Sequence, residues 1–195
     1  RKRDLIYSIT SSPDGSVCVN DISDVDRIFD GRLSYDKGGY VLLMLRGQIG
    51  DEAFYRGMKN YLCDPRTVNG FTTTDIFREN MEQAADTTLS EFFSDWIWGE
   101  GYPIYDIKWS YSDHQVKINV YQQPSISSGP FFDMKLPVTI KTKSVKETYW
   151  LPNTTQGQQF VIPSQFSPDS VQFNNEYWIL CKEKDFDSGV STQLS

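Results

Sequence analysis

The spacing of apolar residues changes near residue 103, and this change limits the folds open to the chain. From Leu33 to Trp98 apolar residues recur every three or four positions, which is typical of amphipathic helices. From Ile104 onward they alternate, which is typical of strands. The segment GEGYP at 99–103 separates the two patterns, because glycine and proline end helices. The sequence therefore predicts an α+β protein with a small all-α part followed by a β-sandwich.

Helix signals divide the first part into four segments. Ser34 is the predicted N-cap of a first helix that ends at Gly50, and Asp51 and Glu52 suit the first turn of a second. Thr74 is the predicted N-cap of a third helix, and the fourth covers Leu89 to Trp98. We expect these helices to form one domain over residues 1–103, with residues 1–30 mostly loop.

The alternating segments after Ile104 are short and separated by turn residues. The predicted strands are 104–111, 114–122, 136–142, 147–152, 158–163, 170–174 and 177–182, with a hairpin turn at Ser112–Asp113. This number and spacing of strands favours an immunoglobulin-like β-sandwich over residues 104–184. We expect the polar tail at 185–195 to be frayed.

Charge and composition exclude several kinds of partner. The net charge is -7, whereas a nucleic-acid surface needs a basic stripe, so no nucleic-acid partner is predicted. No apolar run is long enough for a transmembrane segment, and no signal peptide is evident. The chain has no initiator methionine, which suggests that it was cut from a longer protein.

Two sets of residues invite a metal-site interpretation without supporting one. Asp24, Asp26 and Asp30 lack the spacing and the final glutamate of an EF-hand loop, so we expect an ordinary solvated loop there. The three cysteines have no ligand spacing; one pair could form a disulfide, but their odd and sparse number favours buried free thiols.

Three segments together resemble the zinc aminopeptidases of the aminopeptidase N type, within the gluzincins. They are SYDKGG at 34–39, LRGQIGDEAF at 45–54 and WIWGEGYP at 96–103. The resemblance implies that the helices form the distal half of a gluzincin catalytic domain, followed by the family's β-sandwich. It also implies a hydrolase, a protease that removes N-terminal residues from peptides, with peptide substrates as partners.

On this resemblance, Tyr35 matches the tyrosine that stabilises the oxyanion of the transition state. A phenol has a pKa near 10, so it stays protonated at neutral pH and donates without carrying charge. The alternative is that Tyr35 is a partly buried aromatic whose hydroxyl caps a neighbour. We expect Lys37 to be a surface charge. Gly38 and Gly39 either allow close packing or only weaken the start of the helix.

The family's zinc motif, H-E-x-x-H with a further glutamate, is absent from this sequence, as is its G-x-M-x-N motif. The single histidine, His114, is expected on a strand as a surface or packing residue. The resemblance therefore implies that the parent enzyme binds zinc through ligands upstream of this chain. It implies that the upstream catalytic half is a partner, and that this chain alone binds no zinc and is inactive.

Two other functions stay open. In the first, the chain is a non-catalytic scaffold or a protein- or glycan-binding module that uses aromatics such as Tyr121, Trp150 and Tyr177. In the second, it belongs to a degenerate family member that lost its zinc motif and acts as a chaperone or adhesin. The strands are rich in Thr, Ser and Gln, which favours an extracytoplasmic location, periplasmic or secreted. Asn153-Thr154-Thr155 is a glycosylation sequon, which would matter in a eukaryotic secretory host.

Overall fold

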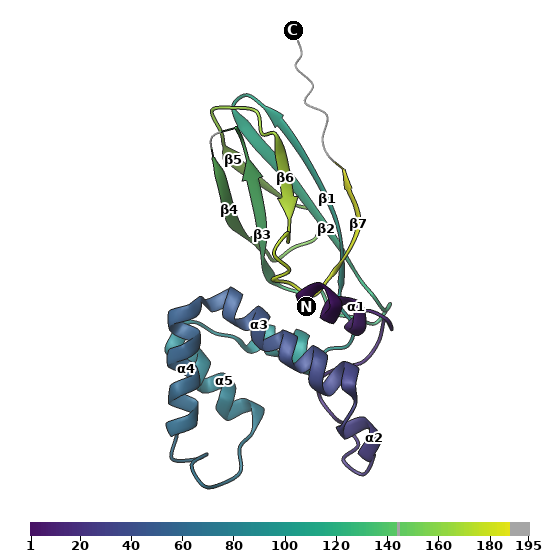
Figure 1. The fold of residues 1–195 in the computed structure, drawn as a ribbon, viewed down its shortest axis with the longest axis vertical. Helices are drawn as coiled ribbons and strands as arrows, with labels where there is room; N and C mark the ends of the chain where they lie inside the picture. The colour runs from purple at the N-terminus through teal and green to yellow at the C-terminus, as the bar shows by residue number, and fades with distance from the viewer. Residues whose placement is uncertain (144, 188–195) are drawn as a thin grey trace. The chain divides into compact units, whose positions relative to one another are not determined.

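The chain forms two compact units in a computed structural model that describes residues 1–143 and 145–187 (Figure 1). One unit is Ser16–Gly99, and the other joins Arg1–Gly15 to the segment that begins at Glu100. The α+β fold class is confirmed, with helices in the first unit and two sheets in the second. The domain boundaries proposed above, 1–103 and 104–184, stay a prediction, although residues 1–15 group with the sheets.

The regular elements of the Ser16–Gly99 unit are helices, joined by loops. Its elements are α2 (Val25–Ile28), the π-helix η1 (Gly31–Lys37), α3 (Gly38–Ile49), α4 (Asp51–Cys63), α5 (Thr74–Ala85), α6 (Ser90–Phe93) and the π-helix η2 (Ser94–Trp98). An apolar stripe on α3 is buried, with Met44 and Leu45 both 0% exposed. Aromatic rings of three other helices touch in series, with centroids 5.2 Å apart for Tyr61 and Phe77 and 5.9 Å for Phe77 and Phe93.

Two of the predicted helix starts are wrong. Ser34 is not an N-cap, because the helix begins earlier, where the Asp30 carboxylate accepts a hydrogen bond from Leu33 N at 2.6 Å. Ser34 lies inside η1. The third helix is capped by Thr73 rather than Thr74, and Thr73 Oγ1 accepts from Ile76 N at 3.3 Å. Both corrections follow from which side-chain oxygen reaches an unpaired N–H of the first turn.

Gly57 allows α4 and α5 to approach closely. It is buried, and a Cβ at this position would lie 2.5 Å from Met81 Sδ and 3.3 Å from Ala84 Cβ. Gly39 on α3 differs, because no atom of the described residues lies within 4 Å of an added Cβ there.

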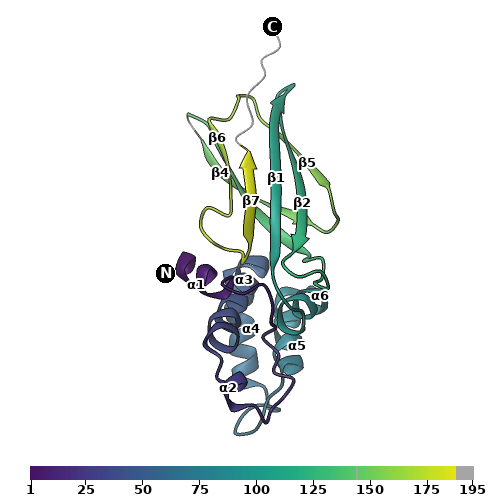
Figure 2. The same ribbon diagram turned by 90° about the vertical axis from the view of Figure 1, so that its right-hand side faces the viewer.

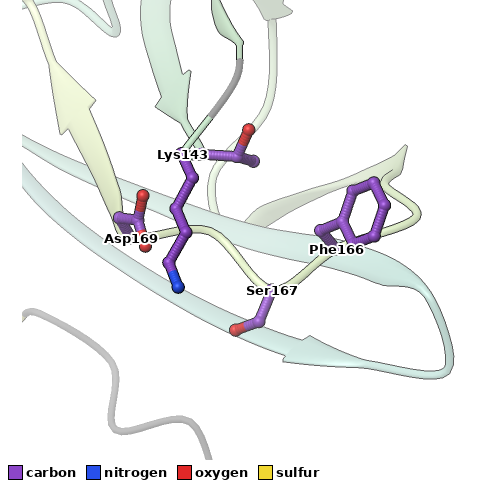
Figure 3. Close-up of a pocket in the computed structure, with 5 residues that line it drawn as sticks. Lys143, Phe166, Ser167 and Asp169 are labelled. Atoms are coloured by element: carbon purple, nitrogen blue, oxygen red, sulfur yellow. The ribbon is translucent and has the colours of Figure 1, made fainter.

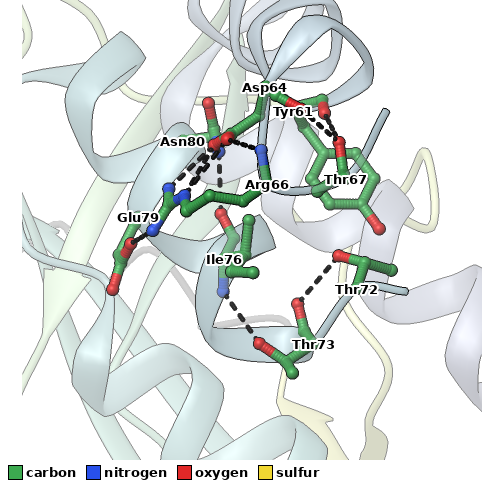
Figure 4. A network of polar contacts seen from close by, with 9 residues as sticks. All are labelled: Tyr61, Asp64, Arg66, Thr67, Thr72, Thr73, Ile76, Glu79 and Asn80. Carbon is green, nitrogen blue, oxygen red and sulfur yellow. Dashed lines mark hydrogen bonds and ion pairs between the residues drawn. The ribbon is translucent and has the colours of Figure 1, made fainter. Parts of the chain in front are cut away.

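A network of polar contacts stabilises the loop between α4 and α5 (Figure 4). Asp64 accepts hydrogen bonds from Arg66, including one from Nη2 at 2.7 Å, and from Asn80 Nδ2 at 2.9 Å. Arg66 also pairs with Glu79 on α5 at 2.7 Å. The Arg66 guanidinium, followed by the Asn80 amide, holds the pKa of Asp64 well below its usual range. The loop is thus tied to α5 by charge-assisted bonds.

The other unit contains a helix, α1 (Lys2–Ile9), and a β-sandwich. The strands of the described part are β1 (Pro103–Ser112), β2 (Gln115–Pro124), β3 (Met134–Lys141), β4 (Lys146–Asn153), β5 (Gln158–Pro163), β6 (Ser170–Phe173) and β7 (Lys182–Asp187). They form one sheet in the order β5-β2-β1-β7 (Figure 2) and another in the order β4-β3-β6 (Figure 1). All neighbours are antiparallel except β1 and β7, which are parallel.

The predicted alternation defines the core of the sandwich. Ile107 on β1 and Ile118 on β2 are both buried, at 1% and 0% exposure. The rings of Tyr105 and Phe173, from different sheets, lie 5.3 Å apart, so side chains of the two sheets meet in one core.

Three details of the strand prediction are wrong. Residues 177–181 are not a strand, because the Asn174 side chain accepts from Trp178 N and Ile179 N at 2.8 and 3.0 Å and occupies the backbone groups that a ladder would use. The hairpin turn is Asp113–His114, both with positive φ, so His114 lies in a turn and not on a strand. The predicted tail begins too early, since β7 extends to Asp187; its remainder lies outside the described residues.

Two expectations about polar segments also change. The N-terminal 30 residues contain α1 and α2, which the loop prediction did not include. Asn153 of the sequon is only 1% exposed, and its Nδ2 donates to Thr155 O at 3.1 Å. Its Oδ1 accepts from Gln122 Nε2 at 3.2 Å. The sequon asparagine is therefore an internal hydrogen-bonding group of the folded sandwich.

We expect Gly57→Ala to lower the free energy of unfolding by about 1–3 kcal/mol, because the added methyl overlaps Met81. Gly39→Ala is the matched control, since its methyl meets open space, and it should raise stability by up to about 1 kcal/mol through helix propensity. Urea unfolding of both variants measures the difference. Equal effects of the same sign would contradict the close approach of α4 and α5.

We expect the Asp64 network to contribute a stability that acid removes. Because the folded-state pKa of Asp64 is lowered, the contribution is complete above its unfolded value near 4 and is lost as pH falls below it. Melting temperatures measured by circular dichroism between pH 7 and 2 should therefore fall less steeply for Asp64→Asn than for the wild type. Asp75→Asn is the comparison variant, because it removes another carboxylate of the helical unit, whose contact to Arg78 is longer, at 3.3 Å.

Candidate functional site

Tyr35 lies on η1, just before α3 begins at Gly38. Its side chain is 60% exposed, so it is not the partly buried aromatic considered above. The same helix then continues into the buried stripe of α3, which fixes the helix while leaving the phenol in solvent. An exposed phenol on an anchored backbone can donate a hydrogen bond to a bound molecule without first breaking an internal contact.

The backbone around Tyr35 has a π-helical turn. Ser34 N and Tyr35 N both donate to Asp30 O, at 3.0 and 3.4 Å, and the Asp30 carboxylate caps Leu33 N. Single π-turns within helices occur frequently at functional sites. The sequence did not predict this turn, since its only local signal is an aspartate three residues before Leu33.

Lys37 is buried, at 1% exposure, so the expectation of a surface charge is wrong. The reason is its place on the helix: Leu33 and Lys37 are the buried residues of η1, and the next buried positions are Tyr40 and Val41. Lys37 thus occupies a position of the apolar stripe. A charged group is buried only with compensating contacts, so Lys37 is part of the internal structure and not of the solvated face.

Gly38 and Gly39 do not mark a tight contact. A Cβ on Gly38 would meet Val17 Cγ1 at 3.7 Å, an ordinary contact, and a Cβ on Gly39 would meet nothing. Close packing of either glycine against a neighbouring helix of the described residues is therefore wrong.

A hollow of about 350 Å³ lies within the helical unit, and Gly38 lines it one turn from Tyr35. Its other walls are mostly apolar and aromatic side chains of α3, α4, α5, α6 and η2, together with Val17 and three threonines. The lining residues are Val17, Gly38, Val41, Leu42, Leu45, Tyr61, Thr72, Thr73, Thr74, Phe77, Phe93 and Ile97. Such a lining suits an apolar group, and it offers no charged side chain.

The residues considered for metal binding lie apart. Within residues 1–143 and 145–187, no three His, Cys, Asp or Glu side chains gather in an arrangement that could hold a metal ion. His114 Nδ1 lies 3.4 Å from Gln165 O in the sandwich. Asp24 and Asp30 both cap helices, since the Asp24 carboxylate accepts from Arg27 N at 2.9 Å. Asp26 lies in the first turn of α2.

The cysteines are free thiols, but only one of them is buried as expected. Cys181 is buried, which raises its pKa, whereas Cys63 is exposed and Cys18 is intermediate. The expectation of buried thiols is therefore wrong for Cys63, which lies at the exposed end of α4.

The sandwich carries a separate hollow of about 360 Å³, lined by Thr142, Lys143, Phe166, Ser167 and Asp169 (Figure 3). Phe166 is 70% exposed there. Of the aromatics proposed for a binding face, Tyr121 and Tyr177 are exposed at 46% and 36%, while Trp150 packs against Trp178 with centroids 6.1 Å apart. The binding-module alternative stays a prediction.

No helix of the described residues is both long and apolar enough to cross a membrane.

Comparison with known proteins points to one family. The sequence pattern described as Peptidase family M1 domain matches residues 4–96. Probable aminopeptidase 2 of Sulfurisphaera tokodaii is 30% identical over 74% of this chain and 18% of its own length. Aminopeptidase A of Gloydius brevicauda is 28% identical over 84% of this chain and 17% of its own length. The chain therefore spans less than a fifth of either relative.

A solved structure has the same fold. The crystal structure of Legionella pneumophila aminopeptidase A in complex with aspartic acid matches 89% of this chain and 20% of that chain, with a TM-score of 0.75. The sequence identity is 16%, so this likeness concerns the fold.

We expect Asp30→Ala to lower the free energy of unfolding by about 1 kcal/mol, because η1 loses its cap. Asp30→Asn keeps an acceptor oxygen and should cost less. The matched control is Asp26→Ala, four residues earlier, which should change stability by less than about 0.5 kcal/mol. Urea titrations compare the three, and an equal loss from Asp26→Ala would contradict the capping role.

Proposed function

Because this chain is a fragment homologous to the M1, aminopeptidase N-type peptidases, we propose that it supplies one wall of an active site that removes N-terminal residues from peptides. The observation that carries the proposal is the placement of Tyr35. It is an exposed tyrosine on a capped, anchored helix, within the segment that the M1 domain matches. Its neighbours SYDKGG also match the family's pattern.

In this proposal the Tyr35 hydroxyl donates a hydrogen bond to the oxyanion that develops on the scissile carbonyl. A phenolic O–H is an uncharged donor, so it can stabilise developing negative charge by a hydrogen bond without forming an ion pair. The donor contributes to rate only as far as its position matches the transition state better than the ground state. The anchored helix start supports such a fixed position.

The family's zinc does not fit the residues described here, because they offer no cluster of ligands. We propose that the ligands and the general base belong to another part of the M1 domain, upstream in the complete enzyme. Zinc would supply the polarised carbonyl and the activated water there. This chain would contribute the Tyr35 hydrogen-bond donor and the helices around it. The isolated chain would be inactive because it lacks the zinc ligands and the general base. An extracytoplasmic location remains part of this proposal.

We expect Tyr35→Phe, made in a complete enzyme that carries this sequence, to lower kcat by about a hundred- to a thousandfold with KM little changed. The ring and its packing are kept, so only the donor is lost. Hydrolysis of an amino-acid anilide by purified enzyme, with zinc content measured alongside, gives the comparison. The matched control is Tyr55→Phe, which alters another exposed tyrosine of the helical unit, on α4.

Three results would count against the proposal. Wild-type kcat in Tyr35→Phe would remove the role of the hydroxyl. An equal loss in Tyr55→Phe would show a general sensitivity of the unit. Turnover by the isolated chain would show that the chemistry does not need the rest of the domain.

A further inference from the structure

We propose that Arg27 is a positioning residue for Tyr35, and this inference rests on the function proposed above. Arg27 is half-buried on the short helix α2, eight positions before Tyr35 in sequence. It does not belong to the motifs from which the function was inferred. Its guanidinium ties the turn that carries Tyr35 to two other segments of the helical unit.

The guanidinium of Arg27 makes three hydrogen bonds. Its Nη1 donates to Ser34 Oγ at 3.1 Å, and its Nη2 donates to Ser16 O at 2.7 Å and to Cys18 O at 2.9 Å. All three acceptors are uncharged. Among the described residues the guanidinium therefore acts through its planar geometry, which directs several N–H groups at fixed acceptors, rather than through an ion pair.

Each acceptor connects Arg27 to something further. Ser34 directly precedes Tyr35, and its own Oγ donates back to Arg27 O at 3.3 Å. Cys18 N donates to Ile97 O on η2 at 2.8 Å, so the segment that accepts from Arg27 is itself held to a second helix. Arg27 thus links α2, residues 16–18 and η1 directly, and η2 through Cys18.

Tyr35 needs such support because its own side chain provides little. A ring that is 60% exposed has few packing contacts, so its position depends on the backbone from which it projects. That backbone is a π-turn in which two N–H groups share Asp30 O, a weaker arrangement than regular helical pairing. An error of about 1 Å in a catalytic donor can cost roughly a hundredfold in rate.

The first test measures amide hydrogen exchange in this chain by NMR and needs no activity. In Arg27→Lys, which keeps the charge and loses the planar guanidinium, exchange at Tyr35 and Cys18 should accelerate by about tenfold. Ser34→Ala removes only one acceptor, so it should accelerate Tyr35 and leave Cys18 unchanged. Arg56→Lys is the matched control, since Arg56 also holds a backbone oxygen, Ala84 O at 2.6 Å, elsewhere in the unit. Unchanged exchange in Arg27→Lys, or equal acceleration in Arg56→Lys, overturns the proposal.

The second test is a double-mutant cycle in a complete enzyme that carries this sequence. Arg27→Lys should lower kcat by about tenfold with KM unchanged, while Arg56→Lys alters neither. In a Tyr35→Phe background, Arg27→Lys should have no further effect, because its action passes through the lost hydroxyl. A full additional loss in that background, or an effect on KM alone, overturns the positioning role.

The two tests separate this inference from the function on which it rests. If Tyr35→Phe leaves kcat unchanged, the proposed function fails, and the catalytic part of the Arg27 role fails with it. The exchange measurement then still decides whether Arg27 holds the turn. If Tyr35→Phe is impaired and the cycle is additive, the function stands and the role of Arg27 is rejected.

Discussion

Burial of one face of α3 is the interaction on which the helical unit depends. Met44 and Leu45 are completely enclosed, and full burial of such a side chain contributes about 1.5–3 kcal/mol relative to exposure. The stripe begins one helix earlier, with Leu33 and Lys37 on η1. Because η1 and α3 are continuous, anchoring the stripe also fixes the rotation of the turn before it. The exposure of Tyr35 is therefore a consequence of what its helix buries on the opposite side.

Polar side chains stabilise the helix starts and the loop of this unit, which apolar burial does not hold in place. Asp30 caps the start of η1, and Thr73 caps α5. Asp64 and Arg66 tie the loop between α4 and α5 to the α5 residues Asn80 and Glu79. Short side chains with oxygen acceptors do this work because helix ends and loops carry unpaired N–H groups. The acids that suggested calcium in the sequence serve partly as these caps, which needs no metal.

The sandwich uses the same combination with a different periodicity. Alternating apolar residues of β1 and β2 face the core, while Gln122 and Asn153 form a buried polar cluster. The Gln122 side-chain amide donates to Phe132 O at 3.0 Å and accepts from Phe132 N at 3.0 Å. It therefore pairs both backbone groups of Phe132, as a neighbouring strand would. Buried amides are tolerated because their donors and acceptors are paired.

Sequence alone determined the elements whose signal is local and repeated. The apolar period over residues 33–98 and the alternation after 104 identified the helices from α3 to η2, six of the strands and the α+β class, but not α1 and α2. The ordered SYDKGG, LRGQIGDEAF and WIWGEGYP segments indicated the homology to aminopeptidase N-type peptidases. Tertiary structure decided which of several similar groups makes each contact. Asp30 rather than Ser34 caps the first helix, and Lys37 is buried rather than exposed. The Asn174 side chain bonds the backbone of residues 178 and 179, where the sequence predicted a strand. These outcomes depend on which side chains the fold brings within about 3 Å, a distance that spacing along a chain does not specify.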